Sequence, residues 1–87
     1  MPSLLDIHES LHWATIESSV LKAAAYDPAE QLLYLEFHSG DLYRYFDFLP
    51  EQYRDLLAAE SKGKYFNRYI RYWFAYEPLP QSRRAGR

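Results

Sequence analysis

The sequence predicts a small α+β domain, in which an antiparallel three-stranded sheet is followed by two short helices packed on one of its faces. Within residues 31–38, Leu33, Leu35 and Phe37 alternate with Tyr34, Glu36 and His38, with the period of two that is typical of a strand. Ser39 and Gly40 then mark a tight turn. Pro50 opens a segment in which apolar side chains recur with helical spacing. A chain of 87 residues suits one such domain.

The sheet is predicted from consecutive segments joined by turns. The three strands are expected at residues 19–26, 31–38 and 41–48. In the first strand, Leu21, Ala23 and Ala25 are expected to share one face. Pro28 fixes φ in the turn that follows this strand.

The second turn decides which residues of the third strand face the core. A two-residue loop would place Arg44 beside the apolar side chains of residues 31–38. A three-residue loop with a left-handed Gly40 would instead place Tyr43 and Tyr45 there. We expect the second arrangement, because it keeps a charged side chain out of the core.

Two helices are predicted after the strands. The first starts at Pro50 and ends before Gly63, with an apolar stripe of Tyr53, Leu56 and Leu57. The second spans residues 64–71, and its apolar side holds Tyr65, Phe66, Tyr69 and Ile70. Residues 72–76 fit a short C-terminal edge strand that Pro78 and Pro80 would end.

Composition excludes several classes of protein. The chain has no Cys, which excludes a disulfide scaffold and a thiolate metal site. No apolar run approaches about 18 residues, and no signal peptide is recognisable, so we expect a cytoplasmic protein without a membrane partner. We divide the chain into a partly ordered N-terminal extension (1–17), the domain (18–78) and a basic, disordered tail (79–87).

Charge is distributed unevenly along the chain. Residues 1–61 carry a net charge of −8, whereas residues 62–87 carry +6. The cations of the second helix recur at i, i+4 and i+7, with aromatic residues between them. The candidate residues for binding nucleic acid are Lys62, Lys64, Asn67, Arg68 and Arg71. The alternative is a solvated helix face whose rings turn to the core.

A metal site is suggested by one short motif. His8, Glu9 and His12 match the H-E-x-x-H pattern of zinc hydrolases. The pattern lies outside the predicted domain, and only His38 or a scattered carboxylate remains as the third protein ligand that a catalytic zinc needs. We therefore expect a chance match, with no metal and no cofactor. The sequence also has no Gly-x-Ser-x-Gly motif and no Gly-rich phosphate loop, so we expect no catalytic residues.

A series of short motifs resembles the KTSC domain family, over residues 18–78. These motifs are Tyr26-Asp27-Pro28, Ser39-Gly40, Tyr43-Arg44-Tyr45-Phe46 and Gly63-Lys64-Tyr65-Phe66-Asn67. The family is named for its place at the C-terminus of some lysyl-tRNA synthetases, and it also occurs as small stand-alone bacterial proteins. The resemblance implies no catalytic residues, suggests RNA as a ligand, and carries its motif onto Tyr43, Tyr45, Tyr65 and Phe66, which we expect to be structural.

We therefore expect a non-enzymatic module that binds RNA, either tRNA or single-stranded RNA. The basic helix face would contact phosphates. The alternative is a protein-interaction module, or a homo-oligomer, that uses exposed aromatic residues. The two differ in their response to salt, because phosphate binding weakens steeply with salt and an aromatic interface does not.

Overall fold

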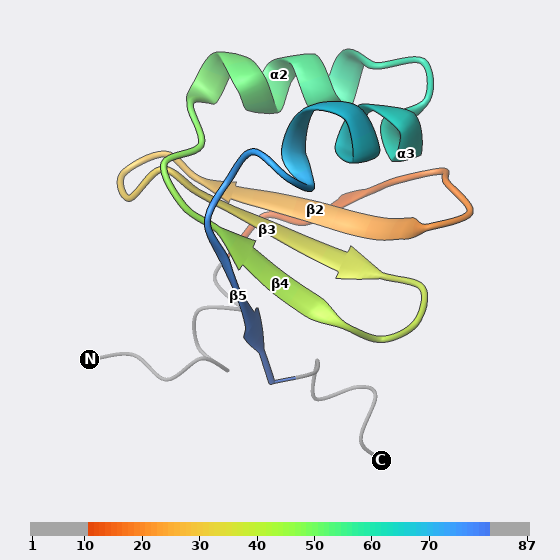
Figure 1. The fold of residues 1–87 in the computed structure, drawn as a ribbon, viewed down its shortest axis with the longest axis horizontal. Helices are drawn as coiled ribbons and strands as arrows, with labels where there is room; N and C mark the ends of the chain where they lie inside the picture. The colour runs from red at the N-terminus through yellow and green to blue at the C-terminus, as the bar shows by residue number, and fades with distance from the viewer. Residues whose placement is uncertain (1–10, 81–87) are drawn as a thin grey trace.

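The computed structural model of the protein describes residues 11–80. They form a five-stranded antiparallel sheet in the order β1-β2-β3-β4-β5, and the helices cover one of its faces (Figure 1). The strands are β1 (Ala14–Thr15), β2 (Leu21–Asp27), β3 (Leu32–Phe37), β4 (Leu42–Tyr45) and β5 (Tyr76–Leu79). The helices are α2 (Pro50–Ala58), α3 (Lys62–Tyr65) and the π-helix η1 (Phe66–Ile70). Within the described part of the chain, no helix is long and apolar enough to cross a membrane.

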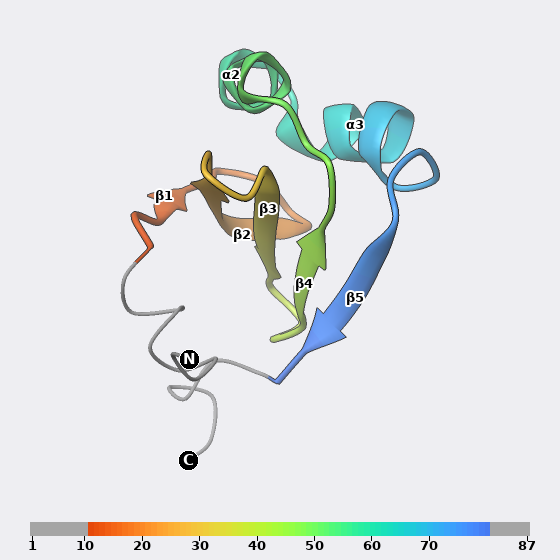
Figure 2. The same ribbon diagram turned by 90° about the vertical axis from the view of Figure 1, so that its left-hand side faces the viewer.

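The α+β class and the antiparallel sheet are confirmed, but the predicted number of three strands was too low. The two additional strands, β1 and β5, form the two edges of the sheet (Figure 2). The edge strand expected at residues 72–76 lies later, at Tyr76–Leu79, and it contains Pro78. A proline is tolerated there because an edge strand leaves one row of N–H groups without a partner in the sheet.

The predicted turn at Gly40 is confirmed. Gly40 has a φ of 98°, and the Phe37 N–H donates to the Asp41 carbonyl at 2.9 Å. The three-residue loop places Tyr45 opposite Leu33 in the register of β3 and β4, and Tyr43 opposite Leu35. Both tyrosines therefore lie on the face covered by the helices. Arg44 lies on the opposite face, where its side chain forms an ion pair with Glu77 of β5.

The expected face of the first strand was wrong in part. The register of β2 against β3 shifts between Leu21 and Ala23. As a result Leu21 and Ala24 both belong to the core beneath the helices. Ala25 is buried on the other face, opposite Tyr34. A bulge inserts one residue and so exchanges the faces that follow it.

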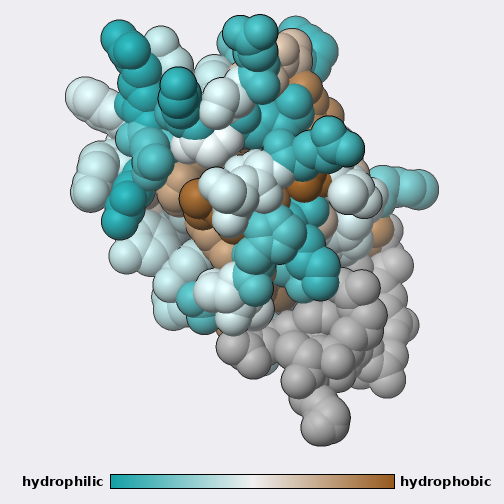
Figure 3. All heavy atoms as spheres, turned by 90° about the vertical axis from the view of Figure 1, so that its right-hand side faces the viewer, coloured by the Kyte–Doolittle hydropathy of each residue, from teal (hydrophilic) through white to brown (hydrophobic). Residues whose placement is uncertain are grey.

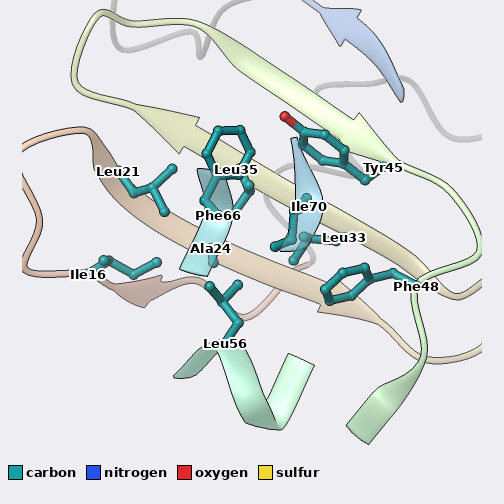
Figure 4. Close-up of a cluster of buried hydrophobic side chains, with 10 residues drawn as sticks. All are labelled: Ile16, Leu21, Ala24, Leu33, Leu35, Tyr45, Phe48, Leu56, Phe66 and Ile70. Carbon is teal, nitrogen blue, oxygen red and sulfur yellow. The ribbon is translucent and has the colours of Figure 1, made fainter. Parts of the chain in front are cut away.

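The helices close over the sheet and complete one hydrophobic core. Helix α2 begins with Pro50 at its first position, and Leu56 is its buried residue. The core members are Ile16, Leu21, Ala24, Leu33, Leu35, Tyr45, Phe48, Leu56, Phe66 and Ile70 (Figure 4). Ser61 caps α3 by accepting a hydrogen bond from the Lys64 N–H at 3.3 Å.

Gly63 does not end a helix, contrary to the sequence-based expectation. Helix α2 has already ended at Ala58, and Gly63 lies inside α3. The chain continues as the π-helix η1, whose turn is wider than that of an α-helix: the Arg71 N–H donates to the Phe66 carbonyl, five residues earlier, at 2.9 Å. This wider turn buries Phe66 and Ile70 and leaves Tyr69 half exposed, so Tyr69 does not share the buried side of the helix.

Candidate nucleic-acid interface

The predicted basic residues divide into two groups in the structure. Lys64, Asn67, Arg68 and Arg71 are exposed on α3, η1 and the residue that follows η1. Lys62 is half-buried, and its Nζ donates a hydrogen bond to the Ala59 carbonyl at 2.9 Å. Its charge therefore stabilises the C-terminal end of α2, where free carbonyl groups gather. We name the four exposed residues the basic face.

The two arginines of the basic face lie against aromatic rings. The Arg68 guanidinium carbon is 5.7 Å from the centre of the Tyr69 ring, and that of Arg71 is 5.3 Å from the Tyr72 ring. Between two residues of the described segment the only ion pair is Arg44–Glu77, so neither arginine of the basic face has a carboxylate partner there. A guanidinium that lies over a ring, and not against a carboxylate, keeps its N–H groups available to an anion.

Four large aromatic side chains are exposed around the basic face. The exposed fractions are 51% for Tyr69, 77% for Tyr72, 74% for Trp73 and 55% for Tyr76. The indole Nε1 of Trp73 donates to the Arg68 carbonyl at 3.0 Å, which fixes a ring that remains open to solvent. Trp73 and Tyr76 were not among the residues predicted from the sequence to bind nucleic acid. The sequence does contain a signal for them, because the run of aromatic residues after the last helix holds more rings than a thin core can bury.

A groove runs between this segment and the sheet. It has a volume of about 490 Å³, and we name it the tyrosine groove. Phe37, Tyr43, Tyr45 and Phe66 line it together with Val20, Asn67, Arg71, Tyr72 and Tyr76. On the side of the molecule that carries α3 and the β3–β4 turn, hydrophobic side chains lie recessed between hydrophilic ones (Figure 3).

The tyrosines of the groove form an ordered cluster. The Tyr76 ring lies 5.5 Å from Tyr43 at 88° and 5.7 Å from Tyr45 at 34°, measured between ring centres. This follows from the register of β4 and β5, in which Tyr45 and Tyr76 are direct partners. Burial, with a smaller contribution from Tyr43 and Tyr76, raises the pKa of Tyr45 above its usual value, and the nearby Arg71 partly opposes this shift.

A second hollow lies on the other side of the exposed rings. It has a volume of about 590 Å³ and is lined by residues that include Tyr65, Tyr69, Trp73 and Asp55. Asp55 is exposed and lies on α2. A carboxylate in the wall makes this hollow less favourable than the tyrosine groove for an anionic ligand.

The residues of the H-E-x-x-H motif are only partly described. His8 and Glu9 lie outside the described residues, as do the arginines of the tail. His12 is exposed, and residues 11–80 contain no group of three His, Asp or Glu side chains that could hold a metal ion. The third histidine, His38, is engaged elsewhere, because its Nε2 lies 2.9 Å from the Ser18 carbonyl oxygen.

Comparison with known proteins shows what this architecture is similar to. The profile of the KTSC domain matches residues 17–74. A protein of Tsukamurella paurometabola is 54% identical over 52 residues, which are 60% of this chain and 78% of that protein. An uncharacterized protein of Stutzerimonas stutzeri is 44% identical over an alignment of 63 positions, which covers 67% of this chain and 89% of that protein.

Two further similarities are to a much longer protein and to a protein of known structure. The lysine–tRNA ligase of Nostoc punctiforme is 43% identical over 63 residues, which span 72% of this chain but 11% of the ligase. The crystal structure of a KTSC domain protein from Yersinia pestis has a TM-score of 0.78 and 22% identity, and the match covers 82% of this chain and all of that one. From the match over residues 17–74 and these relatives, the chain belongs to the KTSC domain family.

Proposed function

We propose that this domain binds RNA, with the basic face contacting phosphates and the exposed rings stacking on unpaired bases. The observation that carries the proposal is the composition of residues 64–76. Residues 64–76 hold cations that form no ion pair with a carboxylate of residues 11–80. Four large exposed rings lie beside these cations. Cations follow a phosphate backbone, and aromatic rings stack on bases of any sequence, so this combination suits single-stranded nucleic acid.

The relatives support the same ligand. Lysine–tRNA ligases of two Nostoc strains and of Trichormus variabilis share with this chain a stretch of 63 residues at 40–44% identity. Those enzymes act on a tRNA, and a segment that binds RNA would be useful in them. The role proposed here is binding without catalysis, because the cations, amide and tyrosine hydroxyls of residues 64–76 suit contacts with phosphates and bases.

A protein partner is the second candidate. Tyr72 and Trp73 are the most exposed of the large hydrophobic residues in the described segment, at 77% and 74%. Tyr and Trp are enriched at the energetic centres of protein interfaces. Under this alternative, the same rings would dock on another protein or on a second copy of the chain.

Binding to a panel of RNAs at two salt concentrations tests the proposal. Fluorescence anisotropy would measure the affinity for a tRNA, a single-stranded RNA and a duplex DNA at about 50 and 200 mM salt. For Lys64→Ala and Arg68→Ala we expect weaker binding on every RNA, and a salt slope lowered by about 0.7–0.9 for each phosphate that the variant no longer binds. Arg54→Ala is the matched control, because Arg54 is an exposed arginine of α2.

Each result has a defined meaning. Weaker binding by the two basic-face variants, with an unchanged Arg54→Ala protein and unchanged melting curves, supports the proposal. Absence of binding to every nucleic acid at the lower salt concentration would overturn it. Equal losses for Arg54→Ala and Arg68→Ala would also overturn it, because binding would then depend on net charge and not on this face.

A further inference from the structure

The hydroxyl of Tyr45 lacks a partner within the described residues. The Tyr45 residue is only 3% exposed and lines the tyrosine groove, and no hydrogen bond joins its hydroxyl to another of residues 11–80. In Figure 4 the hydroxyl oxygen of Tyr45 lies at the border of the cluster of labelled side chains. The hydroxyl is not among the fully buried side-chain atoms of residues 11–80 that lack a partner, where Arg44 Nε is found, so it opens onto the groove. A polar group on the wall of the tyrosine groove is therefore available to a ligand that enters it.

The rim of the same groove carries a positioned cation. The Arg71 Nη1 donates to the Asn67 Oδ1 at 3.1 Å, and its guanidinium lies 5.3 Å from the Tyr72 ring centre. Two contacts thus restrict this side chain at the mouth of the groove. The π-helical turn contributes to this placement, because the Arg71 N–H bonds back to the Phe66 carbonyl. Turns of this kind are frequent at functional sites.

The remaining walls favour a flat, apolar group. Tyr72 and Tyr76 are exposed at the rim, while Phe37 and Phe66 line the interior. The volume of about 490 Å³ lies within the range of roughly 300–1,000 Å³ that small-ligand sites occupy. The lining of the groove contains an arginine and an amide but no carboxylate. A ring that carries an adjacent anionic group matches these features in both shape and charge.

We propose that the tyrosine groove holds one unpaired nucleobase of the bound RNA, with the base against Tyr76, an edge of the base on the Tyr45 hydroxyl, and the adjoining phosphate on Arg71. This inference rests on the proposed function and adds a position of base recognition to it. Phosphate contacts hold an RNA without reading its sequence, whereas a hydrogen bond to a base edge distinguishes one base from another. The domain then has a preference at one nucleotide.

The conservative variant Tyr45→Phe isolates the hydroxyl. The probes are fluorescein-labelled hexanucleotides of uridine, adenosine, cytidine or guanosine, with affinity measured by anisotropy at about 50 and 200 mM salt. The wild-type protein should prefer one of the four, and Tyr45→Phe should reduce that preference about fivefold or more while the salt slope is unchanged. Tyr76→Ala should weaken all four by about tenfold, because stacking does not depend on the base.

Tyr69→Ala is the matched control for Tyr76→Ala. The two rings have similar exposed fractions, 51% and 55%, but Tyr69 lines the other hollow. Because Tyr69 is one of the exposed rings proposed to stack on bases, Tyr69→Ala should weaken binding of all four hexanucleotides alike and leave the preference among them unchanged. If the protein binds RNA but Tyr45→Phe and Tyr76→Ala bind like the wild type, the groove proposal is wrong and the basic face still stands. The groove proposal is also wrong, and the basic face still stands, if Tyr69→Ala removes the preference and Tyr45→Phe does not.

A separate measurement covers the case in which no RNA binds and the proposed function fails. The four nucleoside 5′-monophosphates at millimolar concentration are titrated into the protein, and the ring signals of its tyrosines are followed by NMR. Shifts that Tyr45→Phe and Arg71→Ala both weaken would show that the groove takes a nucleotide. Absence of shifts with all four would overturn the groove proposal independently.

Discussion

Gly63 packs against Ser18, because a methyl group at position 63 would lie 3.2 Å from the Ser18 Oγ. Ser18 has little freedom to move away. Its Oγ accepts hydrogen bonds from the N–H groups of Val20 at 3.1 Å and Leu21 at 3.2 Å. The turn that leads into β2 therefore fixes the distance between the sheet and α3, and a glycine inside a helix is the residue that fits this distance.

Gly63→Ala should destabilise the protein. Ala gains about 1 kcal/mol of helix propensity over Gly, but overpacking against a fixed neighbour costs about 1–3 kcal/mol. We expect a net loss of about 1 kcal/mol in the free energy of unfolding, measured with urea. In the Ser18→Ala background the same substitution should be neutral or stabilising. Equal effects in both backgrounds would contradict a role for this contact.

Phe66→Ala should remove most of the stability of the domain. Phe66 is buried, and its ring packs edge-on against Phe37 at 5.4 Å and Tyr45 at 6.0 Å. Replacement of a buried Phe by Ala costs about 3–5 kcal/mol. Thermal unfolding followed by circular dichroism is the measurement. Tyr65→Ala should cost less, because Tyr65 is only half-buried, and an equal loss for both would be inconsistent with the structure.

Stability should decrease at alkaline pH, in part through Tyr45. Burial raises the pKa of Tyr45 and of Tyr53 above the usual value of 10.0. The unfolded chain therefore ionises first, so the stabilisation is complete below about pH 10 and is lost as the pH rises through the raised pKa. Melting temperatures between about pH 8 and 11 should fall less steeply for Tyr45→Phe than for the wild type. The control Tyr72→Phe, at an exposed ring, should follow the wild-type curve.

The ion pair on the outer face of the sheet should hold β5 in place. Arg44 and Glu77 are direct partners across β4 and β5, and their side chains are 19% and 41% exposed. Burial alone would lower the pKa of Arg44, but the favourable interactions of its guanidinium with Tyr34 and Glu77 raise it. We expect Glu77→Gln to cost about 1 kcal/mol, because part of the pair is still screened by solvent.

A local measurement distinguishes this effect from a general loss of stability. The Phe46 N–H donates to the Ala75 carbonyl at 3.0 Å, so its hydrogen exchange reports the attachment of the segment that leads into β5. Glu77→Gln should accelerate that exchange more than exchange at Leu33 in the core. A double-mutant cycle with Arg44→Met should give a coupling energy of about 1 kcal/mol that salt at about 1 M reduces. A coupling near zero would show that the pair contributes nothing.

Some parts of the fold could be predicted because one residue excluded the alternative. Arg44 decided the register of the second hairpin, since the other loop would have buried a charge. The face of β2 could not be predicted in the same way. Ala23, Ala24 and Ala25 have identical side chains, so their pattern does not show which one the bulge turns inward. The two-residue strand β1 is held by backbone pairing, which leaves no side-chain signal.

The same contrast applies to the candidate interface. The exposure of Lys64, Arg68 and Arg71 followed from helical spacing. The bond from Lys62 to the end of α2 could not be predicted, because it depends on where that helix stops. The tyrosine groove could not be predicted either. The groove depends on the register of β4 and β5, which places Tyr76 beside Tyr45. The whole helical segment separates these two strands in the sequence.

The strand order gives this groove a particular place in the folding of the chain. Strands β1 to β4 are joined by short connections, so each can pair with the next as a local hairpin. Residues 46–75, in contrast, separate β4 from β5. Pairing of β5 with β4 therefore closes the longest loop in the sheet, at the largest cost in chain entropy. Tyr45 and Tyr76 lie opposite each other in that pairing. A ligand bound across the two strands would add its binding free energy to the attachment of β5 and so stabilise the folded domain.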